Sequence, residues 1–204
     1  MEDPDLALLA AWKGGDAGAG DRLLAGHFDG VLRFFRSKLG DDVEDLVQRT
    51  FLDLLEAVAD DQPLSFRAYL FTIARRRLLD HLRARYRPNA DLALVTSLSV
   101  ADLGTSPSGI VARGQQERAL LAALRTLSVD HQVALELAYW EDLSGREIAQ
   151  VLGIAEHTVR SRLARARDAL REALERGADA TASVATLESF DARARRAFRA
   201  PDAS

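Results

Sequence analysis

Apolar residues recur three and four positions apart along most of this chain, which is the spacing of helices that bury one face. In the N-terminal part the pattern predicts helices over residues 3–13, 21–38, 42–59 and 65–86. Asp3 or Asp5 can cap the first of these helices, and Ser65 can cap the fourth. Gly40 and Pro88 mark the ends of the second and the fourth.

The apolar stripes indicate which side chains face the core. In the second predicted helix the stripe includes Phe28 and Phe35, and in the third it includes Phe51, Leu54 and Leu55. We expect these side chains on or near the buried sides of their helices, because an amphipathic helix is stabilised by burying its apolar face.

Residues 88–112 differ in character from the chain before them. Charge falls, Ser, Pro and Gly become frequent, and no long helical period survives, as is typical of a linker. The predicted fold is therefore all-α, with two small helical domains at 1–87 and 113–176 joined by a flexible linker. Residues 177–204 are rich in Ala and weakly patterned, and we interpret them as a C-terminal extension that is disordered or forms a short helix.

The segment Ser144–Arg171 carries the strongest local pattern. A short amphipathic helix stops at Gly153, and a second helix begins around Glu156. The apolar stripe of the second helix consists of Val159, Leu163, Ala166, Leu170 and Leu174. Its other faces are rich in Arg, whose planar fork suits phosphates and guanine edges. The segment is typical of a helix-turn-helix with a recognition helix. From this segment alone, an ordinary helical hairpin with a solvated basic face remains an alternative.

Charge is distributed unevenly along the chain. The net charge is −4, from 27 Lys and Arg against 31 Asp and Glu, which is unusual for a nucleic-acid-binding protein. Residues 41–61 are acidic and contain Arg49 as their single basic residue, whereas residues 67–87 are basic. An acidic helix suits a basic protein partner, and a basic helix suits nucleic acid. Two solvated faces that neutralise each other would give the same charge pattern.

The composition offers little for catalysis. The chain has no Cys, which excludes disulfides and thiolate metal sites and suits a reducing cytoplasm. Its four His are scattered, and it has neither a Gly-rich phosphate loop nor a nucleophile elbow. We therefore expect no catalytic residues, no metal and no cofactor, and a protein that is not an enzyme. No apolar run is long enough to span a membrane and the first residues are acidic, so we expect a cytoplasmic protein without membrane insertion.

The order of the motifs adds a resemblance to a known family. A D-x-E-D motif at residues 42–45 precedes an aromatic and basic helix, a linker and the helix-turn-helix. The matching segments are Asp42-Val43-Glu44-Asp45-Leu46-Val47-Gln48, Phe66-Arg67-Ala68-Tyr69-Leu70, Leu79-Asp80-His81-Leu82-Arg83 and Thr158-Val159-Arg160-Ser161-Arg162-Leu163. With these motifs the chain resembles the bacterial RNA polymerase sigma factors of the extracytoplasmic-function type, over roughly residues 5–175.

The resemblance implies a role for each domain. The first domain would be a region 2-like unit that binds the polymerase clamp and recognises and melts the minus-ten element, with residues 60–65 in the loop that captures a flipped base. The second would be a region 4-like unit that reads the minus-thirty-five element. The implied polymerase contacts are Asp42, Glu44, Asp45 and Gln48. The implied minus-ten contacts are Ser65, Tyr69, Arg75, Arg76, His81 and Arg83. The implied minus-thirty-five contacts are His157, Thr158, Arg160, Ser161 and Arg165.

The resemblance also implies partners, and the chain departs from the family at three positions. The partners would be core RNA polymerase, promoter DNA and an anti-sigma factor. Arg76 stands where the family often has Asn, Tyr69 where it often has Trp, and Arg49 where an acidic residue is common. The alternative function is that of a helix-turn-helix regulator that binds an operator as a dimer. Such a protein needs a dimerisation helix and enough basicity to hold DNA alone, and this acidic chain shows no heptad seam.

Overall fold

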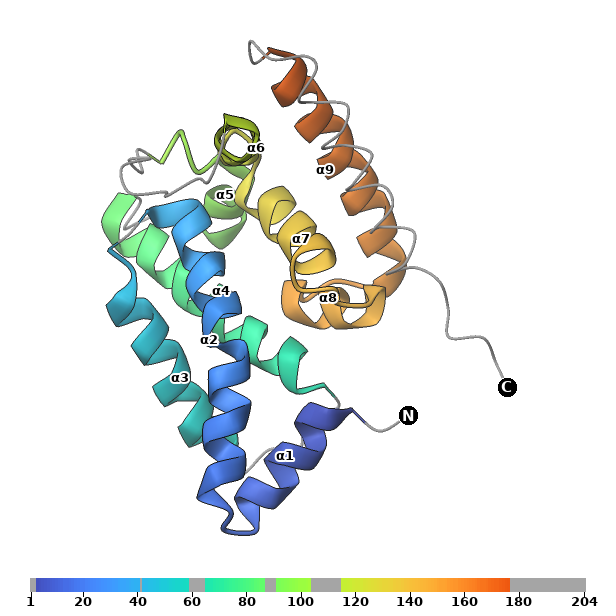
Figure 1. Ribbon diagram of the computed structural model, residues 1–204. Coiled ribbons are helices and arrows are strands. Elements are labelled where there is room, and N and C mark those ends of the chain that lie inside the picture. The colour runs from blue at the N-terminus through green and yellow to red at the C-terminus, as the bar shows by residue number, and fades with distance from the viewer. Residues whose placement is uncertain (1–2, 41, 59–64, 87–90, 104–114, 177–204) are drawn as a thin grey trace.

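The computed structural model describes residues 3–40, 42–58, 65–86, 91–103 and 115–176. These residues form helices and one isolated β-bridge, between Ser99 and Ser128, so the predicted all-α class is confirmed (Figure 1). The N-terminal half contains α1 (Pro4–Lys13), α2 (Ala17–Leu39), α3 (Glu44–Val58) and α4 (Phe66–Tyr86). The C-terminal half contains α6 (Gln115–Arg125), α7 (Val129–Tyr139), α8 (Gly145–Leu152) and α9 (Glu156–Arg176), and α5 (Leu92–Ser97) lies between the halves.

The predicted caps at Asp3 and Ser65 are confirmed. In each, a short polar side chain accepts a hydrogen bond from a backbone N–H group in the first turn of the helix. Asp3 accepts a hydrogen bond from the backbone N–H of Asp5 at 3.0 Å, and Ser65 accepts one from that of Ala68 at 3.2 Å. α2 begins at Ala17, earlier than its sequence pattern predicted, because Asp16 caps it. The sequence before Asp21 contains glycines, which usually argue against a helix.

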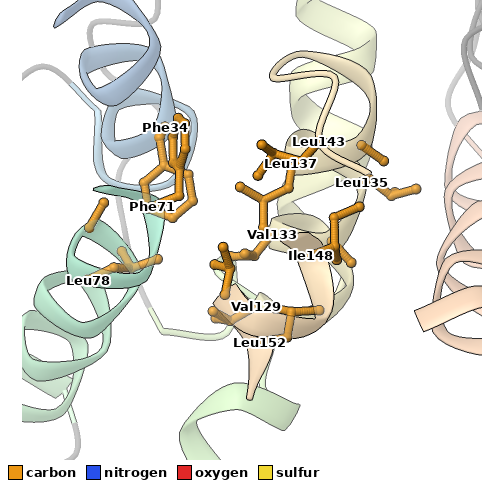
Figure 2. Close-up of a cluster of buried hydrophobic side chains, with 14 of the residues drawn as sticks. Phe34, Phe71, Leu78, Val129, Val133, Leu135, Leu137, Leu143, Ile148 and Leu152 are labelled. Atoms are coloured by element: carbon orange, nitrogen blue, oxygen red, sulfur yellow. The ribbon is translucent and has the colours of Figure 1, made fainter. Parts of the chain in front are cut away.

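A single apolar cluster contains residues from both halves of the chain. In the N-terminal half the Phe34 ring lies edge-on to those of Phe35 and Phe71, with ring centroids 5.5 and 5.7 Å away. The C-terminal half contributes buried side chains from α7 and α8, among them Val133 and Ile148 (Figure 2). The halves thus meet through a shared core as well as through polar contacts.

Two of the expected core residues lie on the surface. Phe28 is 46% exposed and Leu55 is 38% exposed, whereas Phe35 and Leu54 are buried as predicted. Phe28 stacks on Phe51, with 6.1 Å between ring centroids. Helical spacing places apolar side chains on a common face but does not determine how far a neighbouring helix covers that face, so the prediction for Phe28 and Leu55 was wrong.

Part of the expected flexible linker is folded against the rest of the chain. Val95, Val100 and Leu103 are buried, and α5 packs against α4 and α7. The backbone N–H of Ala101 donates to the carbonyl of Arg125 at 3.0 Å. A six-residue helix is too short to produce a visible period, which is why the sequence pattern missed it. The remaining linker residues, the loop residues 60–64 and the extension 177–204 lie outside the described residues.

Within the ranges that the structure describes, none of the helices combines the length and the apolar character that crossing a membrane requires.

Candidate nucleic-acid interface

The helix-turn-helix is built by two local devices. Ser144 and Glu147 form a capping box, in which Glu147 accepts from the backbone N–H of Ser144 at 2.8 Å and Ser144 accepts from that of Glu147 at 3.3 Å. α8 then ends at Gly153, whose φ of 66° lies in the left-handed region that favours glycine. α9 starts three residues later at Glu156, as predicted.

One face of α9 packs inward and the opposite face is open. The predicted stripe is buried, with Val159 and Ala166 fully enclosed. His157, Arg160, Ser161 and Arg165 are exposed, and Thr158 is half-buried. These five residues are the minus-thirty-five contacts that the resemblance implied. The structure places them together on the outer side of α9. Arg162 differs from them, because its guanidinium donates to Asp130 of α7 at 2.8 Å.

The acidic motif lies on the open face of α3. Asp42, Glu44, Asp45 and Gln48 are all exposed. Arg36 donates to Glu44 at 3.3 Å, and Arg49 donates to Asp45 at 3.0 Å. The backbone N–H groups of Glu44 itself and of Val43, together with the Arg36 guanidinium, lower the pKa of the Glu44 carboxyl. The Glu44 carboxylate therefore stays charged on an accessible surface.

Apolar side chains extend this acidic surface. Leu52 is 49% exposed and lies one helical turn beyond Gln48, and Leu55 follows it. Phe28 and Phe51 line a neighbouring hollow of about 430 Å³ between α2 and α3. The sequence pattern missed this extension, because an apolar side chain that contacts a partner has the same helical spacing as one that faces the core.

The predicted minus-ten residues fall into three places. Tyr69 and Arg76 line a hollow of about 540 Å³ between α3 and α4. The same hollow is bordered by Arg77, which makes two hydrogen bonds to the Asp53 carboxylate. Asp53 thereby neutralises one member of the basic block. The predicted cation surface of α4 is thus smaller than its sequence indicated.

His81 and Arg83 lie further along α4. Both are half-buried, and burial lowers the pKa of the His81 imidazole, as does the nearby Arg85. Asp42 acts in the opposite direction. His81 is therefore held toward its neutral form, in which it can accept as well as donate a hydrogen bond.

Ser65 and Arg75 face the C-terminal half. The Ser65 hydroxyl donates to Glu147 of α8, and the Arg75 guanidinium donates to Asp130 of α7 at 2.9 Å. The Arg75 side chain is mostly buried by this contact. Two of the six predicted minus-ten residues are thus engaged by the helix-turn-helix domain.

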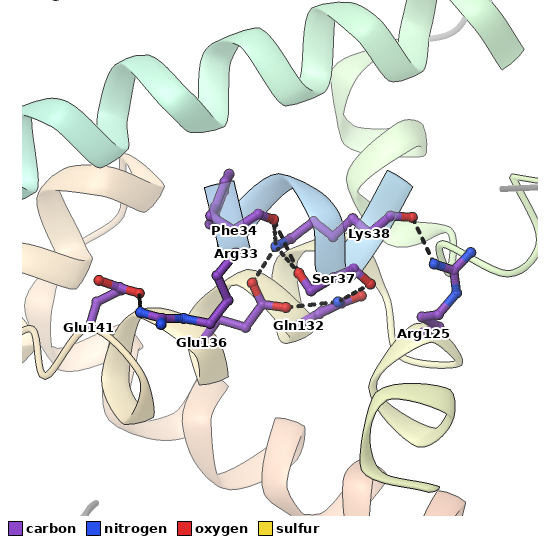
Figure 3. Close-up of polar contacts among 8 residues, drawn as sticks. All are labelled: Arg33, Phe34, Ser37, Lys38, Arg125, Gln132, Glu136 and Glu141. Carbon is purple, nitrogen blue, oxygen red and sulfur yellow. Dashed lines mark hydrogen bonds and ion pairs between the residues drawn. The ribbon is translucent and has the colours of Figure 1, made fainter. Parts of the chain in front are cut away.

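A polar cluster that the sequence pattern did not predict joins the two halves (Figure 3). Lys38 of α2 pairs with Glu136 of α7, and both side chains are enclosed, at 0% and 2% exposed. Nearby, the half-exposed Arg33 donates to Glu141 at 2.6 Å. No local motif marks these residues, because their partners lie about a hundred positions away in the sequence.

Two segments of this chain match models of known protein families. Residues 23–87 match the family model of sigma-70 region 2, and residues 117–170 match that of sigma-70 region 4. The chain is similar to the ECF RNA polymerase sigma factor SigE of Mycolicibacterium smegmatis, with 32% identity over 183 residues that cover 89% of this chain and 68% of that protein.

Two solved structures share the fold. The structure of CnrH in complex with the cytosolic domain of CnrY aligns with a TM-score of 0.63 and 26% identity, covering 86% of this chain and all of that one. The sigma factor RpoE of Bartonella quintana, in complex with the anti-sigma factor NepR, aligns with a TM-score of 0.58 and 26% identity, covering 76% and 96%.

The helical fold and the two matched regions define a sigma-70-type transcription factor. Within that class, the chain belongs to the extracytoplasmic-function RNA polymerase sigma factors.

Proposed function

We propose that this chain binds core RNA polymerase through α3 and directs transcription from promoters that it reads with α4 and α9. The observation that carries the proposal is that an exposed acidic face on α3 and an exposed Arg-bearing face on α9 lie in the two segments that match sigma-70 regions 2 and 4. It binds and positions nucleic acid without bond chemistry of its own, needs no cofactor and acts in the cytoplasm.

Polymerase binding is assigned to Asp42, Glu44, Asp45 and Gln48. The exposed carboxylates of Asp42, Glu44 and Asp45 favour a basic protein surface and disfavour DNA. Leu52 and Leu55 continue the same face of α3, and exposed apolar side chains of this kind add buried area in a protein–protein contact. An acidic and apolar surface therefore supports a protein partner at this place.

Minus-thirty-five reading is assigned to α9. Its N-terminal turn carries His157 and Thr158, where backbone N–H groups favour phosphate. Arg160, Ser161 and Arg165 follow on the exposed side, and Arg can bind guanine edges through two hydrogen bonds. Duplex reading by one exposed helix is the mode of helix-turn-helix proteins.

Minus-ten reading is assigned to α4. The hollow beside Tyr69 and Arg76 combines an aromatic ring with a cation, which together can hold an unstacked base. Arg75, Arg83 and His81 lie on the same helix, and Ser65 caps it. Taking a base out of the duplex costs a few kcal/mol, so the site must supply several such contacts at once.

An anti-sigma factor is the inferred regulator. One of the aligned structures is a sigma factor in complex with an anti-sigma factor, and it covers 76% of this chain. We infer that a protein of this kind binds the present chain as well.

Transcription in vitro with core polymerase and a promoter library tests this function. We expect sequence-dependent initiation only when chain and core polymerase are both present. A helix-turn-helix regulator would instead bind its duplex without polymerase. Tight, specific duplex binding by the isolated chain, together with no affinity for core polymerase, would contradict the proposed function.

A further inference from the structure

The hollow between α3 and α4 is lined by two carboxylates and two guanidinium groups, which differ in how they are engaged. The Asp53 carboxylate accepts from Arg77 through both of its oxygens. Glu56 and Arg76 line the same hollow, and neither side chain makes a hydrogen bond or an ion pair with another residue that the structure describes. A ligand in the hollow would therefore meet the carboxylate of Glu56 and the guanidinium of Arg76.

These two groups come from facing helices. Glu56 lies in the last turn of α3 and Arg76 near the middle of α4, and both side chains are exposed. Asp53 raises the pKa of the Arg77 guanidinium through its hydrogen bonds, and Glu56 raises it further by its charge, which places the Glu56 carboxylate near the basic residues of α4. A group that lies in the hollow can thus contact both charges at once.

The remaining lining of the hollow suits the flat face of a base. Tyr69 supplies an aromatic ring, on which bases stack, and Ile73 supplies apolar surface. The hydroxyl of Thr72 donates to the carbonyl of Ala68 at 2.7 Å, so its oxygen remains available only as an acceptor. The volume of about 540 Å³ lies within the range of pockets that hold small ligands. An unpaired base can therefore lie here with its polar edges toward the two charged groups.

Guanine matches these two charged groups better than the other three DNA bases do. Its N1–H and N2–H₂ donors lie side by side and fit the two oxygens of a carboxylate, while its O6 and N7 acceptors fit the two prongs of an Arg. Adenine and cytosine each offer a carboxylate one amino group, and thymine offers one N–H between two carbonyls. Each of these three bases leaves one carboxylate oxygen without a donor.

The carboxylate of Glu56 supplies the selectivity. A guanidinium can donate to a carbonyl, to a ring nitrogen or to a phosphate, so Arg76 alone would accept several bases. A carboxylate that loses water against a base without matching donors costs more than a missing attraction does, because the charge is left unpaired. Glu56 would therefore reject the other bases as well as hold guanine.

We propose that Glu56 and Arg76 make this hollow selective for an unpaired guanine of the melted minus-ten segment. This inference rests on the proposed function, because it names the base that the minus-ten surface of α4 takes. Glu56 binds N1–H and N2–H₂, and Arg76 binds O6 and N7. Asp53 and Arg77 satisfy each other and make no contact with the base.

Transcription by the full chain with core polymerase, on a promoter library randomised in the minus-ten segment, tests the base preference. At one melted position we expect guanine to be favoured over each other base by about tenfold. Glu56→Gln should reduce this preference and raise that for adenine, because a Gln amide can donate to N7 and accept from N6–H₂. Glu172→Gln makes the same change at an exposed position of α9 and should retain the preference for guanine.

Two base analogues assign the contacts to single atoms. Inosine lacks the N2 amino group, and 7-deazaguanine lacks the N7 acceptor. Each is placed at the preferred position of a promoter fragment whose minus-ten strand is already unpaired, and each should weaken binding of the original chain with core polymerase by about tenfold. The penalty for inosine should disappear in Glu56→Ala, and that for 7-deazaguanine in Arg76→Ala.

Three results would overturn the inference. The first is a library in which guanine is favoured at no melted position, and the second is a Glu56→Gln chain that keeps the original preference. The third is an equal penalty for inosine in the original chain and in Glu56→Ala. An original chain that fails to bind core polymerase, or that initiates at no promoter, would instead contradict the proposed function, so the two failures are distinguishable.

Discussion

The guanidinium of Arg75, on α4, donates at 2.9 Å to the carboxylate of Asp130, which lies on α7 in the other half of the chain. The second oxygen of the same carboxylate accepts from Arg162 of the recognition helix at 2.8 Å. Asp130 thus joins a residue assigned to minus-ten DNA with the helix assigned to minus-thirty-five DNA. It orients α9 within its own domain and also binds α4 across the contact between the two halves.

Replacing Asp130 by Asn should destabilise the folded chain. The substitution removes a mostly buried charge from between two guanidinium groups, and hydrogen bonds between charged groups contribute about 1.5–3 kcal/mol each to stability. We expect urea unfolding to show a loss of at least about 1 kcal/mol. Asp168→Asn is the matched control, because Asp168 pairs with Arg171 on the exposed surface and should cost about 0.5 kcal/mol or less. Equal losses in the two variants would contradict the bridging role of Asp130.

Replacing Arg165 by Ala should weaken reading of the upstream element. The exposed guanidinium is assigned to the duplex, and a good Arg–guanine contact is worth about 1–3 kcal/mol, or about five- to 150-fold. We expect transcription to fall by that factor at promoters that depend on the minus-thirty-five element, with unchanged affinity for core polymerase. Arg171→Ala, further along the same helix, serves as the control and should have little effect. A loss of the same size at promoters without an upstream element would count against the assignment.

Replacing Asp45 by Arg should affect polymerase binding first. Asp45 is exposed on α3, and a cation there would oppose a basic partner surface. The expected result is a fall of about tenfold or more in affinity for core polymerase, measured by fluorescence anisotropy with labelled chain. Asp21→Arg makes the same charge change at an exposed position of α2 and should retain binding. If both variants lose affinity equally, net charge rather than the α3 surface is responsible.

The local parts of this structure could be predicted because their causes are local. The caps at Asp3 and Ser65, the stop at Gly153 and the buried stripe of α9 each follow from residues a few positions apart. The exposure of the assigned α3 and α9 residues follows from the same helical period. These features need no knowledge of the rest of the chain.

The contact between the two halves could not be predicted, because the residues that form it lie far apart in the sequence. From the sequence alone, Lys38 cannot be distinguished from an ordinary surface charge near a helix end. The structure places Glu136 beside it. The resemblance implies that Arg75 contacts DNA, and the sequence does not show that the Asp130 carboxylate accepts a hydrogen bond from it. Long-range pairing of this kind depends on how the two domains pack, for which a single sequence carries no periodic signal.

The stability of the chain should depend on pH through His131. Burial lowers the pKa of its imidazole, Arg162 and Arg165 lower it further, and Asp130 opposes them. The unfolded chain therefore takes up this proton at a higher pH than the folded chain does, beginning near the ordinary value of about 6.5. The contribution of His131 to stability is complete above that pH and is lost as the pH falls through the lower, folded pKa.

Urea unfolding measures this effect. The free energy of unfolding of the original chain should fall more between about pH 7.5 and about pH 5.5 than that of the His131→Gln chain does. Comparing the two chains cancels the titration of every other group, including Glu136. Glu147 makes little contribution in this range, since burial raises its pKa but hydrogen bonds from Ser65 and Ser144 outweigh that effect and keep it below its ordinary value. Parallel stability curves for the two chains would show that His131 does not titrate differently in the folded state.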